Sequence, residues 1–403
     1  MKKNGYKTGI AGKWMQGVSD KVQMMDGSLD ARDPDVAKRV KENYKHLQES
    51  VKSTGFDYAE SLYYVNPGQW WSDAPLYTPK ELRHHNQEWI TKGAIDFIEQ
   101  SKDEPFFLYM PTTMVHDPMA HDSIKADPQV TQAGYLDEAP DVQPPRHTIF
   151  ERLKGRGIDF DNIKPEQEMQ AHFLSGTLWL DDGIGAVLDK LDELALADNT
   201  VVIYASDNGR KAKFSTYDSA AKMPCLIRWP GKIKPDSVCN ELASNIDFAP
   251  TIYDICGITP PSNAVIDGKS LLPALTGGRY KRDHIFMEIT VERAVVTDDR
   301  FKYIAVRYPP QIREKVDKGE LYNHWCQPME FGVWGHSYNA ELYYPSYFDA
   351  DQLYDLSKDP HEQNNLADNP DYSEKLTQMK KIMRMYSRNL PHPFAEFKKK
   401  NQS

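Results

Sequence analysis

The sequence predicts an α/β protein in which a mostly parallel sheet is sandwiched between helices, followed by a smaller C-terminal α+β subdomain with an antiparallel sheet. Two observations favour this fold. Up to about residue 278, apolar runs alternate with segments of helical periodicity, as in parallel strands joined by crossover helices. From about Arg282 onward, short strand-like runs follow one another through tight turns. The sequence therefore predicts an α/β domain over residues 1–278 and a C-terminal subdomain over residues 279–403.

The first strand is expected near the start of the chain. Residues 6–14 carry the small and β-branched side chains of a short strand and are bounded by glycines. Residues 34–52 have charged and apolar side chains at helical spacing, and Gly55 then ends the predicted helix. An aromatic-rich loop is expected to follow at residues 63–71.

A second helix and a second strand come next. Residues 79–100 show helical spacing, with Thr78 as the expected N-cap. The unbroken apolar run at residues 105–110 predicts a strand covered on both faces of the sheet. A long polar connection is then expected to run to about Ile163.

The remainder of the α/β part repeats the alternation. Residues 166–194 have a helical apolar stripe and lead into the buried-strand pattern of residues 200–206. Residues 224–229 predict another apolar strand, and residues 247–256 resume helical spacing.

The C-terminal part has the pattern of a meander closed by a helix. Residues 284–289, 293–297 and 301–306 are short strand-like runs, with a turn signal at residues 297–300. A terminal helix is predicted over residues 372–388.

Composition excludes some classes of protein. The chain has 49 Lys and Arg against 59 Asp and Glu, a formal net charge of −10, which argues against a general nucleic-acid binder. The apolar runs are far shorter than the roughly 20 residues of a bilayer span, so no membrane span is predicted. The first seven residues show no export signal, so the chain as written is expected in the cytoplasm, or in the periplasm or outside the cell if a signal precedes it. The disulfide status of the four cysteines stays open.

Polar residues follow three of the predicted strands. In an open α/β sheet, ligands bind beyond the carboxyl ends of the strands. The residues found there are Lys13, His116, Asp207 and Asn208, followed by Lys211 and Lys213. Oxygen donors suit a hard divalent cation such as Ca²⁺ or Mg²⁺, while ammonium and imidazole groups suit an anionic tetrahedral substrate.

Each of these signals has an ordinary structural interpretation. The D-N-G sequence at residues 207–209 is by itself typical of a turn. A single histidine before D-P commonly forms loop hydrogen bonds, and lysines near strand ends are mostly solvated. The functional interpretation gains support because three separate strands end in complementary chemistry.

Several motifs occur in order along the chain. They are G-Y-K-T-G-I-A-G-K-W-M-Q-G at 5–17, V-H-D-P at 115–118, L-D-D-G-I-G at 180–185, S-D-N-G at 206–209, I-R-W-P-G-K-I-K at 227–234, D-F-A-P-T at 247–251, G-K-S-L-L-P at 268–273 and L-Y-D-L at 353–356, followed by D-P-H-E at 359–362. In this order and spacing, the sequence resembles the type I sulfatase family of the alkaline phosphatase superfamily over nearly its whole length.

The resemblance implies an alkaline-phosphatase-like fold and roles for the residues at the strand ends. Asp207 and Asn208 match the family's later pair of calcium ligands, with Ca²⁺ preferred over Mg²⁺. Lys13 matches the lysine that contacts the nucleophile and the sulfate, and His116 matches the histidine near the leaving-group oxygen. Lys213 matches the second sulfate-binding lysine, with Lys211 as the alternative.

The sequence departs from the family at two places. Met15 replaces the histidine of the G-K-W-H motif and cannot donate a proton. No cysteine or serine lies in the C/S-x-P/A-x-R motif that supplies the family's formylglycine nucleophile. Asp181 and Asp182 do not replace the family's first aspartate pair, because they lie in a helical pattern.

These departures predict that the start of the chain is truncated or misassigned. Residues 1–4 match the last turn of a helix that precedes G-Y-x-T in the family. The resemblance then implies a sulfuric ester hydrolase, resembling an arylsulfatase, that is inactive over these 403 residues alone. A sheet without one interior strand would expose unpaired amides, so poor solubility or association is also expected.

Two other functions stay open. One is a non-catalytic pseudoenzyme or anion-binding module, which Met15 favours, and the other is a phosphoester or phosphonate hydrolase of the same superfamily. The expected ligand is a sulfated small molecule or sulfated carbohydrate, with no nucleic acid. Several aromatic side chains could stack on sugars or pack in the core, namely Tyr63, Tyr64, Trp70, Trp71 and Trp325. The natural substrate, the oligomeric state and the role of Lys222 are not determined by the sequence.

Overall fold

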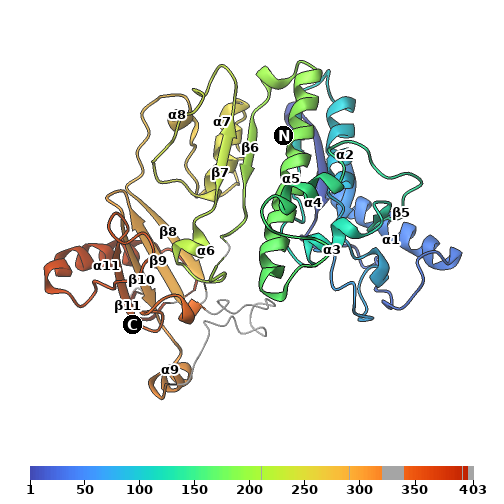
Figure 1. Cartoon of the computed structure of the whole chain (residues 1–403). Helices are drawn as coiled ribbons and strands as arrows, with labels where there is room; N and C mark the ends of the chain where they lie inside the picture. Colours follow the sequence, from blue (N-terminus) through green and yellow to red (C-terminus); the bar gives the residue numbers. More distant parts are fainter. Residues whose placement is uncertain (210, 290, 320–339, 393, 398–403) are drawn as a thin grey trace. The chain divides into compact units, whose positions relative to one another are not determined.

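The computed structural model describes residues 1–403 except 210, 290, 320–339, 393 and 398–403 (Figure 1). The chain divides into two compact units, residues 1–200 and 201–403, and each is described by itself. The predicted boundary between residues 278 and 279 stays a prediction. Within the described part of the chain, no helix combines the length and apolar character of a membrane span.

The first unit is built on a three-stranded parallel sheet. Its strands are β1 (Lys7–Lys13), β2 (Tyr58–Tyr63) and β3 (Phe106–Tyr109), in the order β2-β1-β3. The central strand β1 is buried from Thr8 to Gly12, as its small side chains predict. The predicted loop at residues 63–71 is wrong at its first residue, because Tyr63 ends β2. Residues 58–63 form no unbroken apolar run, and parallel pairing with β1 makes them a strand.

Helices α1 (Pro34–Ser53) and α2 (Gln87–Gln100) pack against this sheet. The Asp33 carboxylate caps α1 by accepting hydrogen bonds from the backbone N–H groups of Asp35 and Val36. The predicted helix over residues 79–100 is wrong in its first turns. There a 3₁₀ turn, η2 (Lys80–Leu82), is followed by a break, and Asn86 rather than Thr78 caps α2.

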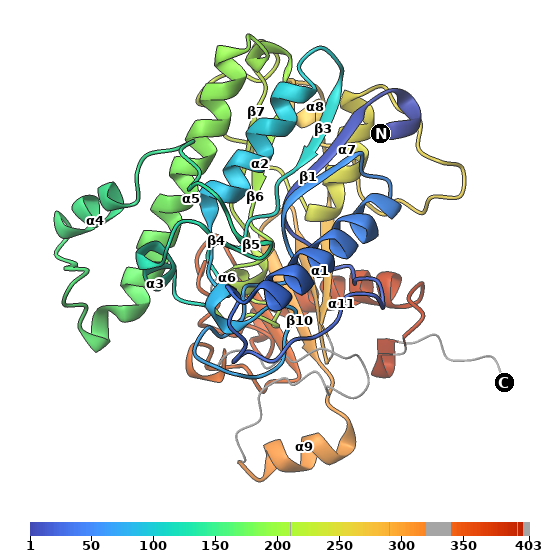
Figure 2. The same cartoon turned by 90° about the vertical axis from the view of Figure 1, so that its right-hand side faces the viewer.

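The predicted polar connection to residue 163 contains short elements. They are α3 (Ala120–Lys125), β4 (Val130–Thr131), β5 (Gly134–Tyr135) and α4 (His147–Lys154). The long helix α5 (Glu168–Glu193) follows, and Figures 1 and 2 show it alongside α2. The remaining 3₁₀ turns of the described residues are η1 (Lys2–Asn4), η3 (Pro165–Gln167), η4 (Ala197–Asn199), η5 (Asn245–Asp247), η6 (Ala340–Leu342), η7 (Pro370–Tyr372) and η8 (Ala395–Phe397).

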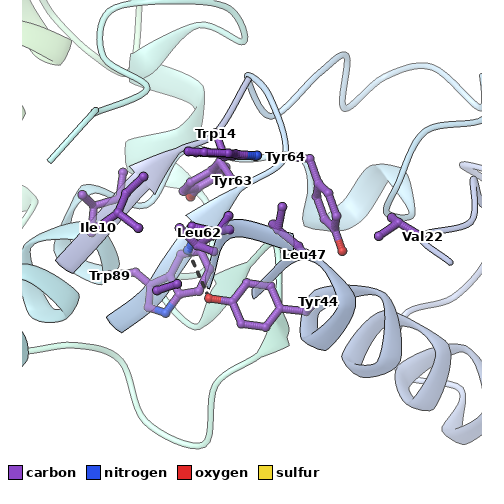
Figure 3. Packing of buried hydrophobic residues seen from close by; sticks show 12 residues of the cluster. Ile10, Trp14, Val22, Tyr44, Leu47, Leu62, Tyr63, Tyr64 and Trp89 are labelled. Atoms are coloured by element: carbon purple, nitrogen blue, oxygen red, sulfur yellow. Dashed lines mark hydrogen bonds between the residues drawn. The ribbon is translucent and has the colours of Figure 1, made fainter. Parts of the chain in front are cut away.

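Aromatic side chains dominate the core of the first unit (Figure 3). Tyr63 and Trp89 meet nearly edge to face, with ring centroids 5.5 Å apart. The Tyr44 hydroxyl accepts a hydrogen bond of 3.1 Å from the backbone N–H of Leu62. Tyr63 and Tyr64 are therefore core residues, which favours the packing interpretation for both.

The second unit contains a strand pair and a four-stranded sheet. Strands β6 (Val202–Ala205) and β7 (Cys225–Arg228) pair antiparallel, so β7 departs from the parallel pattern. Strands β8 (His284–Ile289), β9 (Glu292–Thr297), β10 (Phe301–Val306) and β11 (Asp351–Asp355) form the antiparallel sheet, in the order β11-β10-β9-β8. The helices among the described residues of this unit are α6 (Asp218–Ala221), α7 (Phe248–Ile255), α8 (Leu272–Leu275), α9 (Pro310–Asp317) and α11 (Ser373–Ser387).

The predicted fold class is confirmed, with a parallel sheet flanked by helices and a C-terminal antiparallel sheet. The predicted meander at residues 284–306 is correct to within one residue. Strand β11 was not predicted, because its pairing partner β10 lies some fifty residues earlier in the chain. Cys225, Cys239 and Cys256 are free thiols, and Cys326 lies outside the described residues.

Candidate functional site

Lys13 lies where the ends of all three parallel strands of the first unit meet. Its backbone N–H donates to the carbonyl of Pro111, which follows β3. Its Nζ donates at 3.2 Å to the Oδ1 of Asn66, which follows β2. Gly12 makes this approach possible, since its φ is +126° and an added Cβ would lie 2.0 Å from the Pro111 oxygen. The lysine is therefore fixed beside the segment that leads to His116.

His116 belongs to a turn whose backbone is hydrogen-bonded by a buried histidine, His85. The His85 Nε2 lies 2.8 Å from the carbonyl oxygen of His116 and 3.0 Å from that of Pro118. Carbonyl oxygens only accept, so Nε2 carries the proton and Nδ1 accepts from the Thr113 hydroxyl at 2.7 Å. Burial lowers the pKa of His85 to about 3, so the ring is neutral at neutral pH. These contacts, here called the His85 network, hold the backbone at His116 while its side chain stays exposed.

Met15 and its neighbour Trp14 have opposite environments. The Trp14 ring is buried, and its Nε1 donates to the carbonyl of Gly17 at 2.8 Å. The Met15 side chain is 60% exposed. The position where the family motif has a histidine is therefore largely exposed on the surface of this unit.

Asp207 and Asn208 follow β6 in the second unit. Asp207 is exposed, and the Ser206 hydroxyl donates to the Asn208 carbonyl at 2.7 Å. The turn packs closely on α6, because the Gly209 N–H donates to the Ala220 carbonyl at 2.7 Å. Asp207 and Asn208 thus belong to one turn that is anchored to α6.

Lys213 lies in an unusual stretch of backbone. Ala212 and Phe214 on either side of it have φ values of +51° and +67°. Side chains other than glycine rarely adopt this left-handed region, which costs on the order of 1–3 kcal/mol per residue and persists only where packing requires it. Lys211, the alternative lysine, has its Nζ 5.2 Å from the centre of the Tyr343 ring. The Lys213 Nζ has a similar contact, 5.5 Å from the centre of the Phe214 ring, so the choice of Lys213 over Lys211 stays a prediction.

Buried acceptors on the antiparallel sheet hold the segment after Lys213. The Oε2 of Glu292, at the start of β9, accepts from the Thr216 N–H at 2.8 Å and from its hydroxyl at 2.9 Å. The Tyr217 hydroxyl donates to the Oε1 of Gln352 on β11 at 2.7 Å. The Tyr217 ring also stacks on Tyr344, with centroids 3.6 Å apart. The C-terminal sheet therefore forms the support under Lys213.

A buried triad of charges completes this support. The Lys302 ammonium, which is fully buried on β10, pairs with Asp218 at 2.8 Å and with Glu362 at 2.7 Å. Glu362 also accepts from the Asp218 N–H at 2.7 Å. Burial by itself lowers the pKa of Lys302, but the carboxylates of Glu362 and Asp218 more than offset this and raise it. The three residues, here called the Lys302 triad, explain why the D-P-H-E motif ends in glutamate.

The predicted residues form two sets. Lys13 and His116 lie at one edge of the parallel sheet in the first unit. Asp207, Asn208 and Lys213 lie on one segment in the second unit, and a common site for both sets stays a prediction. Lys222 follows α6 and is exposed.

The described residues offer few oxygen ligands for a metal ion. Ca²⁺ takes about six to eight oxygen ligands. The described residues contain no group of three or more His, Cys, Asp or Glu that could hold a metal. Asp207 and Asn208 therefore do not complete a calcium site in the described part of the chain, and no cysteine or serine motif fits a formylglycine.

Sequence reasoning missed the residues that position the site. His85, Glu292 and Lys302 are buried polar residues, and nothing in their local periodicity distinguishes them from surface positions. Glu362 was part of a recognised motif, but its partner Lys302 lies sixty positions earlier. Only the pairing of distant segments identifies these roles.

Family models agree with the motifs. The model described as Sulfatase matches residues 1–258, and the model described as N-sulphoglucosamine sulphohydrolase, C-terminal, matches residues 209–332. The chain belongs to the sulfatase family. The chemistry of this family generally involves a metal and a formylglycine.

Individual relatives agree with this assignment. An N-acetylgalactosamine-6-O-sulfatase of Bacteroides thetaiotaomicron is 29% identical over 69% of this chain and 47% of its own length. An ulvan-active sulfatase of Formosa agariphila is 34% identical over 45% of this chain and 36% of its own length. This sulfatase-family chain thus spans less than half the length of either relative.

A solved structure in complex with its substrate D-glucosamine-2-N,6-O-disulfate shares the fold, with a TM-score of 0.55 and 19% identity. The match covers 96% of this chain and 80% of that structure. At this identity the similarity supports the sulfatase fold alone.

Proposed function

We propose that this sulfatase-family chain carries the sulfate-recognising part of a hydrolase of sulfate esters in carbohydrates. Lys13 and Lys213 would bind the sulfate oxygens, and His116 would lie near the leaving-group oxygen. The observation that carries the proposal is the position of Lys13, fixed at the shared end of three parallel strands beside the His116 segment. In α/β sheets this is the edge at which ligands bind.

The proposed roles follow from charge and proton transfer. Two ammonium groups would offset the charge that builds up on the sulfate oxygens as the sulfur–oxygen bond breaks. His116 would donate a proton to the departing oxygen, and the His85 network would fix the position of its backbone. Asp207 and Asn208 are proposed as two ligands of a divalent cation, Ca²⁺ ahead of Mg²⁺, whose charge would add to that of the lysines.

A sulfated carbohydrate is the proposed ligand class. The relatives include enzymes named for sulfated amino sugars and for ulvan, and a structure of the same fold was solved with a disulfated glucosamine. These names support a sulfated sugar as the first probe. The position of the sulfate on the sugar is left to the experiment.

Binding tests this proposal without requiring turnover. Residues 1–403 are titrated by calorimetry with N-acetylgalactosamine 6-sulfate and with the unsulfated sugar. The sulfated sugar is expected to bind at least tenfold more tightly, and Lys13→Ala is expected to remove most of that preference. Lys7→Ala is the matched control, because Lys7 is exposed at the opposite end of the same strand. Equal binding of both sugars, or equal loss in both variants, would contradict the proposal.

The same titration separates the other two functions. We predict no hydrolysis by residues 1–403 alone, because no nucleophile motif occurs in them. The 6-phosphate sugar binding more tightly than the 6-sulfate would favour a phosphoester hydrolase. The exposed Met15 favours a binding module. Sulfate binding without turnover, even after a segment with the C/S-x-P/A-x-R motif is joined to the chain, would support that alternative.

A further inference from the structure

Two exposed tryptophans stand beside a surface pocket of the first unit. Trp70 is 37% exposed and Trp71 is 57% exposed. The pocket has a volume of about 610 Å³, and its lining includes Trp70, Trp71, Glu81, His84, Asp122 and Asp127. The predicted aromatic set thus divides, because Tyr63 and Tyr64 are core residues and Trp325 lies outside the described residues. Trp70 and Trp71 alone of the described four are available to a ligand.

The loop that carries these tryptophans is held by one buried arginine. The Arg83 side chain is fully buried and donates to the backbone carbonyls of Gln69, Ser72, Ala74 and Thr78 at distances of 2.8–3.3 Å. A guanidinium that bonds four carbonyls of one loop fixes the backbone on both sides of the tryptophans. The two indoles are therefore preorganised.

The aromatic rings form a corner. The Trp70 ring stacks on His84, with centroids 5.8 Å apart and an angle of 28°. Trp71 meets Trp70 edge to face, also at 5.8 Å and at 85°. Because His84 covers part of the Trp70 ring, Trp71 is the more exposed of the two indoles. An exposed, preorganised aromatic face is suited to the apolar C–H face of a sugar ring.

Charges in the lining favour a neutral ligand over an anion. Three carboxylates, those of Glu81, Asp122 and Asp127, face two amines, those of Lys80 and Lys125. Both amines already have partners, since Lys80 bonds to Asp73 and Lys125 to the Phe160 carbonyl. Burial lowers the pKa of His84 to about 4, so its ring adds no charge at neutral pH.

The carboxylates retain acceptor capacity. Asp127 accepts from the Gln129 N–H through Oδ1 and pairs with Arg32 through Oδ2 at 3.8 Å. Glu81 accepts from the Ala31 N–H and from the Tyr135 hydroxyl at 3.1 Å. A carboxylate has about four lone-pair positions, so each can accept further hydrogen bonds. Sugar hydroxyl groups are donors that match them. A sulfate group has no proton to donate to these carboxylates.

We propose that this pocket, here called the Trp71 pocket, binds a neutral sugar residue of a glycan. Trp71 supplies the stacking face, and the carboxylates accept hydrogen bonds from the sugar hydroxyls. The inference deepens the proposed function, since a sulfated glycan also contains sugar units without sulfate. Binding at the Trp71 pocket nevertheless requires neither turnover nor the lysine site.

The test uses neutral hexasaccharides of β-linked glucose, galactose and xylose as probes. Residues 1–403 are titrated with each while tryptophan fluorescence and heat are recorded. At least one probe is expected to bind, and Trp71→Ala is expected to weaken that binding at least fivefold. Met169→Ala is the matched control, because Met169 is also exposed, at 49%, but lies outside the pocket lining. No binding of any of the three probes, or equal binding by both variants, would overturn the proposal.

A second variant separates this proposal from the proposed function. Lys13→Ala is expected to leave neutral-sugar binding unchanged while weakening the binding of N-acetylgalactosamine 6-sulfate. Trp71→Ala is expected to weaken the binding of the neutral hexasaccharide and to leave the binding of N-acetylgalactosamine 6-sulfate unchanged. If Lys13→Ala does not weaken the binding of N-acetylgalactosamine 6-sulfate, the sulfate site is contradicted. If Trp71→Ala does not weaken the binding of the neutral hexasaccharide, the Trp71 pocket is contradicted. A further outcome would also overturn the neutral-sugar assignment. In that outcome, Trp71→Ala weakens the binding of a sulfated hexasaccharide, while the neutral hexasaccharide of the same sugars does not bind at all.

Discussion

Two segments that carry proposed site residues are held by different chemistry. In the first unit, the turn with His116 rests on the neutral ring of His85, through hydrogen bonds to one hydroxyl and two carbonyls. In the second unit, the segment after Lys213 rests on buried charges, the Glu292 carboxylate and the Lys302 triad. Both supports are fully formed inside their own unit.

This difference determines how much free energy of unfolding is lost when a residue of each support is mutated. A neutral hydrogen bond contributes about 0.5–1.5 kcal/mol, and a buried group that loses its partner costs about 1–3 kcal/mol. A buried charge that loses its partner costs about 3–5 kcal/mol, because it is left without solvent or counter-ion. The Lys213 side should therefore respond strongly to mutation, and the His116 side should respond to pH.

The largest effect is expected when the triad is broken. Lys302→Ala leaves the buried Glu362 carboxylate beside Asp218 without a counter-charge and should lower the free energy of unfolding by about 3–5 kcal/mol. Hydrogen exchange of the amides around residue 216 and urea denaturation measure this loss. Lys281→Ala is the control, since the Lys281 side chain is 67% exposed and its partner Asp283, at 3.0 Å, is 71% exposed. That surface pair should contribute less than about 1 kcal/mol. Equal effects of the two variants would contradict the distinction between the two supports.

A smaller effect is expected from pH at the His85 network. The pKa of His85 is depressed from 6.5 to about 3, so the unfolded chain binds a proton below pH 6.5 that the folded chain does not. The contribution of this histidine is thus complete above pH 6.5 and falls as the pH drops toward 3. The loss should be about 2 kcal/mol between pH 6.5 and pH 5, at 1.36 kcal/mol per pH unit.

Hydrogen exchange of the amides in segment 111–118 measures this pH dependence. His85→Asn is the comparison variant. The pKa of nearby His84 is also lowered, and its contribution to the pH dependence of stability remains in both proteins. The difference in slope between the two proteins belongs to His85. Identical slopes would show that the His85 ring does not stay neutral in the fold.

The smallest effect is expected at Met15. Restoring the motif residue by Met15→His changes a side chain that is 60% exposed, so stability should change by less than about 0.5 kcal/mol. Affinity for the sulfated sugar should rise as the pH falls through the pKa of the new imidazole. Calorimetry at pH 8 and pH 6 reads this directly. A loss of stability above about 1 kcal/mol would mean that Met15 packs against part of the fold after all.

The motifs of the sequence determined the family, the order of the elements and the residues proposed for chemistry. Strand β1 and helices α1 and α5 were predicted to within a few residues, since periodicity and glycine positions are local properties. Strand β2 was missed, because its residues become a strand only by pairing with β1. The same reason applies to β11, which is defined by its ladder with β10.

Local sequence determined which residues can bind an anion, since charge and hydrogen-bonding capacity belong to the side chain itself. The tertiary structure decided which side chains hold them in place. His85, Glu292 and Lys302 have positioning contacts only because burial brings distant segments together and removes the water that would otherwise pair with them. The tertiary structure also decided the environment of the aromatic residues. Tyr63 and Tyr64 pack in the core, whereas Trp70 and Trp71 lie on the surface, in a loop that Arg83 holds by hydrogen bonds.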